Sequence, residues 1–315
     1  MKLLLPTTFY SPNAAVGEIP DVETFIAESN EQALEYAPEM DAAFQFSSEK
    51  FVNAAPNLRW IQTLSAGINN LPFQLLLDRG ISVTNAATVY GPNMADHSLG
   101  LMLTLSRQLR VIDRYQAEHG WMKDKPRPVP GELHGQTLLI VGLGGIGLET
   151  ARRAAAFGMK IIATRRHTDR PVPDFVDELH PPEALHDLLS RADWVDICVP
   201  LIPQTKDLIH DREFELMKDG AYLICVTRGG IINNDAMVRA IESGKLSGVG
   251  LDATQPEPLP ADHPLWGFQN VIITPHASGQ AKAAFDRLEK ICVDNIHSFL
   301  AGEKLQNIVH LDLQY

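Results

Sequence analysis

The sequence predicts an α/β protein of two domains, in which one domain holds a doubly wound parallel sheet and the other is smaller. Short apolar runs alternate with helix-like segments along most of the chain, a pattern typical of parallel strands joined by helices. A length of 315 residues corresponds to about two domains of roughly 150 residues each. We assign residues 1–97 and 281–315 to the smaller domain and residues 98–280 to the larger one.

The first hundred residues hold the elements of the smaller domain. The segment from Val22 to Glu35 predicts a helix, and Asp21 is a candidate for its N-cap. The last 35 residues, from about Ala281, predict one amphipathic helix and a tail that return to this domain. Short apolar runs predict four strands, at residues 2–5, 42–46, 59–64 and 80–84.

A long helical pattern leads from the smaller domain into the larger one. It runs from Gly91 to about His119, with Pro92 near its start, where proline is favoured. Such a helix is long enough to bridge two domains or to form a dimer face. An exposed connector rich in proline and glycine follows at residues 123–135. The later apolar runs predict six strands, enough for a dinucleotide-binding sheet, at residues 137–141, 159–164, 194–199, 222–226, 248–252 and 271–274.

Composition excludes several classes of protein. The chain has 27 basic and 39 acidic residues, a formal charge of -12, whereas nucleic-acid-binding domains usually carry a basic surplus. The three cysteines fit no zinc motif. No apolar stretch reaches the roughly 18 residues of a membrane span, and the N-terminal apolar run is too short for a signal peptide. We therefore expect a cytoplasmic protein with no nucleic-acid, membrane or metal partner.

The motif VGLGGIG predicts the phosphate-binding turn of a Rossmann-type domain. Gly142 would allow a tight turn, Gly144 would let the backbone approach a pyrophosphate, and Gly147 would let helix and strand pack closely. The motif follows a predicted strand and precedes a helical segment, which is the context that gives such a motif its meaning. The whole loop is a candidate cofactor site: Gly142, Leu143, Gly144, Gly145, Ile146 and Gly147.

The end of the next predicted strand indicates which dinucleotide binds. NAD sites usually carry a carboxylate there for the ribose 2′-hydroxyl, but this chain has Thr164, Arg165 and Arg166. A guanidinium can bind a 2′-phosphate through two charge-assisted hydrogen bonds. We therefore expect NADP(H) to be preferred over NAD(H), with two solvated surface arginines as the alternative.

Three further residues are candidates for catalysis. Arg228 and His276 each follow a predicted strand, and Glu257 lies between them in sequence. The carboxyl ends of strands line the ligand crevice of an open α/β sheet. Together these residues suit the reduction of a 2-oxo acid, in which Arg228 binds the carboxylate and polarises the carbonyl, and His276 donates a proton. Glu257 would orient His276 and stabilise its protonated form.

The order of these motifs resembles the D-isomer-specific 2-hydroxyacid dehydrogenase family, and most closely its NADPH-dependent glyoxylate/hydroxypyruvate reductases. The glycine loop is followed by TRGG, LDATQPEPLP and TPH, with 29 residues from Arg228 to Glu257 and 19 more to His276. Further similar segments are WIQTLSAGINNL, VTNAATVYGPNMADHSLGLML and VPLIPQTKDLI. The resemblance spans nearly the whole chain and is weakest in the first fifty residues.

The resemblance implies a flavodoxin-like first domain, a homodimer and roles for particular residues. Arg228, Glu257 and His276 match the catalytic arginine, glutamate and histidine, and the first and last of these also lie beside the nicotinamide. Asp252 matches the aspartate that binds its carboxamide. Ser65, Ala66 and Gly67 match the loop whose N–H groups bind the substrate carboxylate. Five further residues match family segments that line the adenosine and nicotinamide of the cofactor: Val199, Pro200, Thr205, Val226 and Thr227.

Two departures and two alternatives accompany this interpretation. Asp96 stands where the family usually has glutamate, and the segment HASGQ lacks the aromatic residue often found after the catalytic histidine. One alternative is a formate-dehydrogenase-like enzyme, although that group carries glutamine at the position of Glu257. The other is a nucleotide-sensing module without turnover. We expect a small 2-oxo or 2-hydroxy acid as the substrate.

Overall fold

The computed structural model describes residues 1–7, 16, 19–68, 70–121 and 129–312. The chain divides into two compact units. The first unit comprises Met1–Tyr90 with Gln280–Tyr315, and the second comprises Gly91–Gly279. The first boundary falls at the start of helix α5 (Gly91–Ser106), whereas our assignment at residue 97 would cut that helix.

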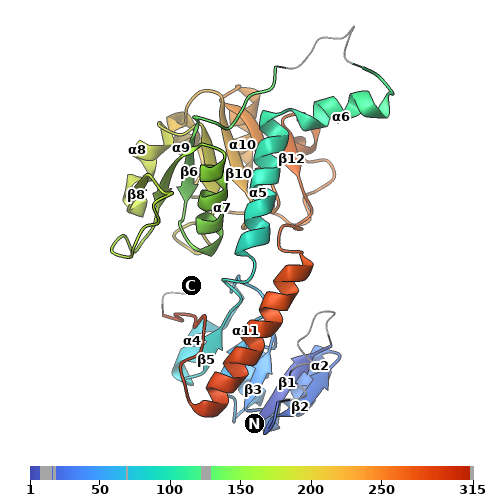
Figure 1. Cartoon of the computed structure of the whole chain (residues 1–315). Helices are drawn as coiled ribbons and strands as arrows, with labels where there is room; N and C mark the ends of the chain where they lie inside the picture. The colour runs from blue at the N-terminus through green and yellow to red at the C-terminus, as the bar shows by residue number, and fades with distance from the viewer. Residues whose placement is uncertain (8–15, 17–18, 69, 122–128, 313–315) are drawn as a thin grey trace. The chain divides into compact units, whose positions relative to one another are not determined.

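The first unit is built on a five-stranded parallel sheet in the order β2-β1-β3-β4-β5. Its strands are β1 (Lys2–Pro6), β2 (Glu23–Ala27), β3 (Ala42–Phe44), β4 (Trp60–Gln62) and β5 (Ser82–Thr84). Its helices are α2 (Asn30–Tyr36), α3 (Glu49–Ala54), α4 (Phe73–Asp78) and α11 (Lys282–Ala301). The last of these runs along the sheet as the long red helix of Figure 1.

Alternation along the strands gives this sheet two buried faces. Leu3 and Leu5 of β1 pack in one cluster with Leu288 and Ile296 of α11, whereas Leu4 lies in the other cluster, under the shorter helices. Successive residues of a strand point to opposite faces, so the run KLLLP supplies apolar side chains to both. This run is therefore a central strand covered on both sides.

The predicted helix from Val22 to Glu35 is wrong in its first half. The segment ETFIA forms β2 and pairs in parallel with all five residues of β1. The helix of this region, α2, begins only after Ser29, whose side chain accepts the N–H of Gln32 at 3.2 Å. Asp21 lies in a turn with φ of 65°. Pairing with β1 outweighs a local pattern that is ambiguous between helix and strand.

The second unit is a doubly wound parallel sheet, as the sequence predicted. Its seven strands lie in the order β12-β11-β10-β9-β6-β7-β8. They are β6 (Thr137–Val141), β7 (Lys160–Thr164), β8 (Glu178–His180), β9 (Trp194–Ile197), β10 (Ala221–Cys225), β11 (Leu246–Leu251) and β12 (Val271–Ile273). The prediction missed β8, which is a half-buried edge strand of three residues with the sequence ELH and therefore lacks an apolar run.

Helices cover both faces of this second sheet. They include α5, α7 (Gly145–Ala156), α8 (Leu185–Leu189), α9 (Asp211–Leu216) and α10 (Asn234–Glu242). Helices α5 and α7 lie side by side (Figure 1). They approach so closely that a Cβ on Gly91 would lie 2.9 Å from the carbonyl oxygen of Gly145. Glycine is therefore required where α5 begins.

The helical pattern expected from Gly91 to His119 is two helices instead of one. Helix α5 ends at Ser106, and α6 (Leu109–Ala117) follows after Gln108, whose φ of 52° is left-handed. A left-handed residue cannot continue a right-handed helix, so the chain changes direction there. Of the connector expected at 123–135, residues 123–128 lie outside the described residues.

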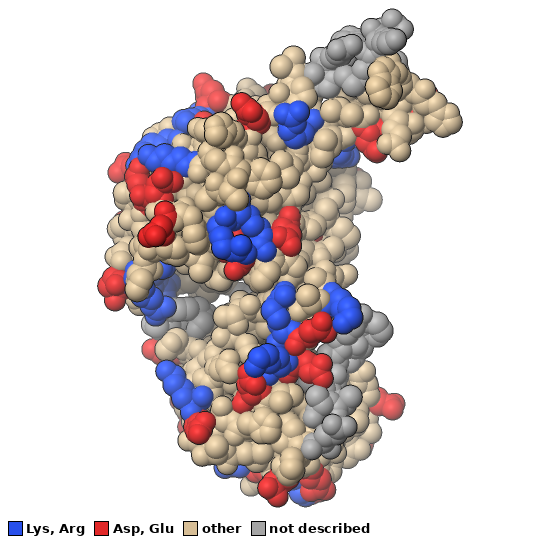
Figure 2. Space-filling model, viewed as in Figure 1, with Lys and Arg blue, Asp and Glu red and all other residues tan. Residues whose placement is uncertain are grey.

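Charged side chains of both signs are intermixed on the face shown in Figure 2. Many of them form ion pairs, such as Arg152 with Glu149 and Arg239 with Asp211. Within the described ranges, no helix combines the length and the apolar character that a membrane crossing needs.

Candidate active site

The predicted site residues of the second unit gather at one edge of its sheet. The strands are parallel, so their carboxyl ends meet at the same edge, where α/β proteins bind ligands. The segments that follow six of these strands contain the glycine loop, Arg165, Val199, Arg228, Asp252 and His276.

The glycine loop has the shape that a dinucleotide phosphate requires. Gly142 has a φ of 102°, and a Cβ there would lie 2.7 Å from a Val199 methyl group. A Cβ on Gly147 would lie 2.3 Å from the carbonyl oxygen of Gly142, whereas one on Gly144 would meet nothing within 4 Å. Gly144 is also the N-cap of α7 and supplies no side-chain cap. The first amides of α7 are thus available to a phosphate, so these residues fit the group.

Thr164 holds this loop in place. Its hydroxyl accepts the N–H of Gly142 at 3.2 Å, and its carbonyl accepts the N–H of Leu143 at 2.8 Å. The side chain is buried at the end of β7. The side chain of Thr164, a residue that we expect at the cofactor site, thus positions the turn.

Arg165 bonds to the loop that follows β7. Its guanidinium donates to the carbonyl oxygens of His167 at 2.8 Å, Arg170 at 2.5 Å and Pro171 at 3.5 Å. These bonds close the loop after β7 around the half-buried Arg165. Its neighbour Arg166 is exposed. The two arginines therefore have different environments, which the sequence could not distinguish.

The other expected lining residues shape the strand-end loops. The Thr205 hydroxyl accepts the N–H of Ile202 at 2.9 Å and donates to the carbonyl of Pro200 at 2.5 Å. The Thr227 hydroxyl donates to the Ile197 carbonyl at 3.2 Å. Val199 packs on Gly142, and Val226 is buried. Both hydroxyls thus bond within the protein.

Glu257 and His276 form the pair that the sequence predicted. The distance from His276 Nδ1 to Glu257 Oε1 is 2.6 Å, and both side chains remain about two-fifths exposed, at 43% and 42%. His276 has a left-handed φ of 53°, which is uncommon for a residue other than glycine. With Nδ1 engaged by the carboxylate, Nε2 is the ring nitrogen left for another partner.

Arg228 is near this pair in the fold but does not bond to it. Its Nη1 donates to the carbonyl of Thr227 at 2.7 Å. A Cβ on the following Gly229 would lie 2.0 Å from the Thr254 carbonyl oxygen, so the TRGG loop presses on the chain just before Glu257. In the part of the chain that the structure describes, no hydrogen bond joins Arg228 to Glu257 or His276.

Asp252 is bound to the backbone that carries His276. Its Oδ1 accepts the N–H of Ala277 at 2.9 Å, and its Oδ2 accepts the N–H of Ser278 at 2.8 Å. The Thr274 hydroxyl donates to Oδ1 at 2.5 Å. Sequence reasoning missed the roles of Thr274 and Ser278, although both lie in the segment VIITPHASG with His276.

The loop Ser65–Gly67 belongs to the first unit, where it follows β4. Its hydroxyl and carbonyl oxygens are engaged: the Ser65 hydroxyl donates to the Gly67 carbonyl at 2.8 Å, and Asn85 donates to the Ala66 carbonyl at 3.1 Å. Among the described residues, none accepts the N–H groups of Ser65, Ala66 and Gly67. Such a run of amides suits a carboxylate.

The described ranges hold no group of three histidine, cysteine, aspartate or glutamate residues placed to bind a metal ion.

Comparison with known proteins identifies related chains. Residues 99–278 match the family model described as D-isomer specific 2-hydroxyacid dehydrogenase, NAD binding domain. A glyoxylate reductase of Thermofilum pendens is 33% identical over 90% of this chain and 86% of its own. A D-3-phosphoglycerate dehydrogenase of Methanocaldococcus jannaschii is 30% identical over 93% of this chain, which spans 56% of that protein.

A solved structure supports the same relationship. A D-isomer specific 2-hydroxyacid dehydrogenase from Xanthobacter autotrophicus Py2, in complex with NADPH and MES, is 25% identical with a TM-score of 0.82. The match covers 100% of this chain and 99% of that one.

Proposed function

Because the chain belongs to the D-isomer specific 2-hydroxyacid dehydrogenase family, we propose that it reduces a small 2-oxo acid with NADPH. The product is a D-2-hydroxy acid, and the substrates are of the glyoxylate or hydroxypyruvate type. The observation that carries this proposal is the 2.6 Å contact between His276 Nδ1 and Glu257 Oε1. Glyoxylate reductases among the relatives support the substrate class.

The residues divide the reaction between them. Bound NADPH supplies the hydride. His276 donates the Nε2 proton to the carbonyl oxygen, and Glu257 stabilises the imidazolium and fixes its orientation. Arg228 binds the substrate carboxylate and polarises the carbonyl, as a planar two-pronged donor can. In the first unit, the amides of Ser65, Ala66 and Gly67 also suit a carboxylate. Asp252 binds the nicotinamide carboxamide.

The cofactor preference rests on the loop after β7. Arg165 closes this loop through three carbonyl contacts, and the exposed Arg166 carries the second guanidinium. The carboxylate usual in NAD sites is replaced at the strand end by Thr164 and Arg165. We assign the 2′-phosphate contact to Arg166 and the shaping of the loop to Arg165.

Exchange of these arginines tests that assignment. Arg166→Gln should lower kcat/KM for NADPH by about tenfold to a hundredfold and leave NADH nearly unchanged, since a charge-assisted hydrogen bond contributes about 1.5–3 kcal/mol. Arg165→Gln should weaken both cofactors because the loop loses its closure. Arg152→Gln, on the exposed side of α7, is the matched control. A wild-type preference for NADH would contradict the proposal.

Steady-state rates with a panel of acids test the substrate class. Glyoxylate and hydroxypyruvate should be reduced faster than pyruvate and faster than branched or aromatic 2-oxo acids. D-3-phosphoglycerate belongs in the panel with NAD(P)⁺, since phosphoglycerate dehydrogenases are also relatives. Turnover only of a bulky acid would reject the substrate class, and binding of NADPH without any turnover would favour a sensor.

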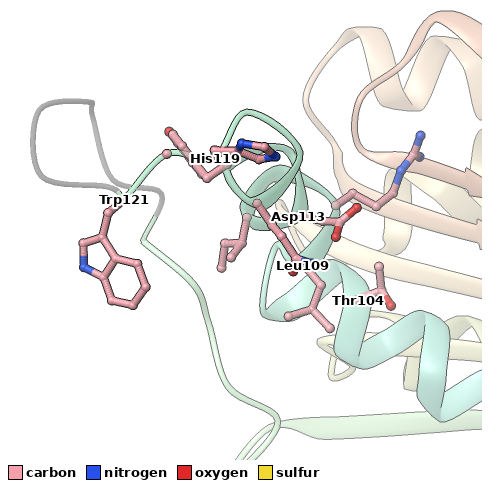
Figure 3. Close-up of a pocket in the computed structure, with 10 residues that line it drawn as sticks. Thr104, Leu109, Asp113, His119 and Trp121 are labelled. Atoms are coloured by element: carbon pink, nitrogen blue, oxygen red, sulfur yellow. The ribbon is translucent and has the colours of Figure 1, made fainter.

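The expected homodimer is proposed to form through α6. No residue of this helix is buried. Leu109 at its start is 46% exposed, and Trp121, which lies beyond its end, is 88% exposed. Together with Ile112 and Tyr115 they line a groove of about 1020 Å³, and Figure 3 shows the Trp121 ring standing apart from the helix. An exposed apolar surface of this kind is typical of a subunit contact. A second copy of the chain is its proposed occupant.

Light scattering after size exclusion tests the dimer. Leu109→Glu should shift the mass from that of a dimer to that of a monomer. Phe157→Glu, which changes a similarly exposed apolar residue (43%) elsewhere in the second unit, should leave the mass unchanged. A monomeric wild-type chain would contradict this part of the proposal.

A further inference from the structure

The turn that carries His276 depends on one residue of the neighbouring strand end. Asp252 follows β11, and its backbone carbonyl accepts the N–H of His276 at 3.0 Å. Its carboxylate accepts the next two amides, those of Ala277 at 2.9 Å and Ser278 at 2.8 Å. Asp252 therefore fixes three consecutive residues, and the first of them is the proposed proton donor in its left-handed conformation.

A second layer of side chains orients Asp252 in turn. The Thr274 hydroxyl lies 2.5 Å from Asp252 Oδ1 and 2.9 Å from Nε2 of His97, which is on α5. Both carboxylate oxygens already accept backbone amides, and an ionised carboxylate can only accept. A hydroxyl has a single proton, which Thr274 gives to Asp252. His97 must therefore donate its Nε2–H to the Thr274 hydroxyl. The hydrogen bonds thus run from His97 to Thr274 and from Thr274 to Asp252.

The carboxylate of Asp252 is buried and therefore needs hydrogen-bond donors such as Thr274. The Asp252 side chain has no solvent exposure, whereas that of His97 is 25% exposed, with its Nε2 3.7 Å from Asp252 Oδ1. In the described part of the chain, His97 is the only basic side chain within 4.0 Å of this carboxylate. A buried carboxylate persists only where donors satisfy it. His97 is thus the donor that joins the buried carboxylate to the surface.

We propose that His97 is a positioning residue for the reaction, acting on His276 through Thr274 and Asp252. This inference rests on the proposed function and adds a residue that touches neither substrate nor cofactor in that scheme. His97 keeps the Thr274 hydroxyl turned toward Asp252, and Asp252 holds the turn so that the His276 ring stays against Glu257. Without His97 the Thr274 hydroxyl can rotate to the Leu251 carbonyl, 3.3 Å away, and leave Asp252 with one donor fewer.

Paired substitutions separate positioning from general stability. His97→Leu removes the donor, while His97→Gln keeps an N–H at a similar reach; Thr274→Val removes the hydroxyl, while Thr274→Ser keeps it. The two donor-lacking variants should lower kcat by about tenfold to a hundredfold, as small misplacements of a catalytic group do. The donor-keeping variants should recover most of the rate. His180→Leu, a similarly exposed histidine of the same unit (33%), is the control.

Two further readouts exclude a purely structural role. The deuterium isotope effect on kcat with 4-deuterated NADPH should rise in His97→Leu, because a misplaced proton donor slows the chemical step, whereas a smaller folded fraction would leave it unchanged. The double variant His97→Leu/Thr274→Val should be no slower than either single variant, since both act through one contact. Additive losses, or an unchanged kcat in His97→Leu, would overturn the inference.

Hydrogen exchange keeps this test distinct from that of the proposed function. The amides of Ala277 and Ser278 should exchange faster in His97→Leu and recover their protection in His97→Gln. A wild-type chain inactive on every acid would reject the proposed function, and the exchange rates would still show whether His97 holds the turn. Unchanged exchange in His97→Leu would overturn the inference even in an active enzyme.

Discussion

Two buried aspartates of the second unit, Asp252 and Asp196, have opposite environments. Asp252 follows the last residue of β11, and three donors meet its carboxylate, from Thr274, Ala277 and Ser278. Asp196 lies inside β9, between Ile140 and Ile224 on the adjacent strands. Among the described residues, neither of its carboxyl oxygens has a hydrogen-bond partner.

The difference arises from where each residue lies along its strand. Inside a sheet the backbone amides are used by the ladder, so a side-chain carboxylate there finds none. Beyond the strand ends, loop amides are available, and Asp252 accepts those of Ala277 and Ser278 in the loop after the neighbouring strand β12. Burial therefore raises the pKa of Asp196 to about 7. Asp252, at a strand end, binds the backbone of the loop that carries His276. Asp196, inside a strand, stays protonated to a higher pH than an ordinary aspartate.

The largest expected effect comes from removing the well-satisfied carboxylate. Asp252→Ala leaves the Thr274 hydroxyl and the amides of Ala277 and Ser278 without an acceptor, which should cost about 5 kcal/mol of unfolding free energy. Activity should fall with it, because the turn of His276 is released. Denaturant unfolding monitored by fluorescence measures the first effect. Asp196→Ala is the contrast, and a loss as large as that of Asp252→Ala would break the comparison.

The pH dependence of stability should reveal the proton on Asp196. In the folded state its pKa is about 7, against 3.8 for an ordinary aspartate. Between these values the unfolded chain releases a proton that the folded chain retains, so stability falls as the pH rises and levels off above about 7. The full difference corresponds to about 4 kcal/mol. Asp196→Asn should lack this component.

Melting temperatures at pH 5, 6, 7 and 8 check this expectation. The wild type should melt at a higher temperature than Asp196→Asn at low pH, and at a lower temperature than the variant at high pH. If the melting temperatures of the two proteins changed with pH in the same way, Asp196 would titrate as an ordinary aspartate, with its carboxylate hydrogen-bonded by the hydroxyls beside it. Arg239→Gln, which removes an exposed ion pair with Asp211, is a control without such a dependence.

The same distinction shows which parts of the molecule the sequence could predict. Apolar runs located six of the seven strands of the second unit, and motif order indicated Glu257 and His276, which lie 2.6 Å apart. Residues that act through hydrogen bonds to residues far along the chain were not predictable. Nothing in the sequence indicates that the hydroxyl of Thr274 joins Asp252 to His97, because that contact exists only once α5 covers the sheet.

The errors have physical causes too. Strand β8 was missed because two of its three residues are polar and all three are half-buried, so it lacks the apolar run that marks a central strand. The pattern of ETFIA fits either a helix or a strand, and only pairing with β1 decides it. The loop contacts of Arg165 were not predictable either, because a sequence shows charge but not which carbonyl groups surround it.

An intermediate effect is expected from the exposed carboxylate of the site. Glu257 and His276 are 42% and 43% exposed, so solvent screens their interaction. Reduction needs the protonated imidazole, and Glu257 stabilises it. In Glu257→Gln the His276 ring loses the acceptor that orients it, so kcat should fall by about tenfold. Steady-state rates measure this loss, and an unchanged kcat would mean that the pair does not act in turnover.

The smallest expected effect concerns a hydroxyl beside Asp196. Ser98 is buried on α5, and in the described chain its Oγ has no hydrogen-bond partner. Ser98→Ala removes an unsatisfied polar atom and should change stability by less than about 0.5 kcal/mol at pH 6. Thr274→Val, which removes a hydroxyl that donates to Asp252, should cost more than 1 kcal/mol. Equal losses in the two variants would show that the two aspartates are satisfied alike.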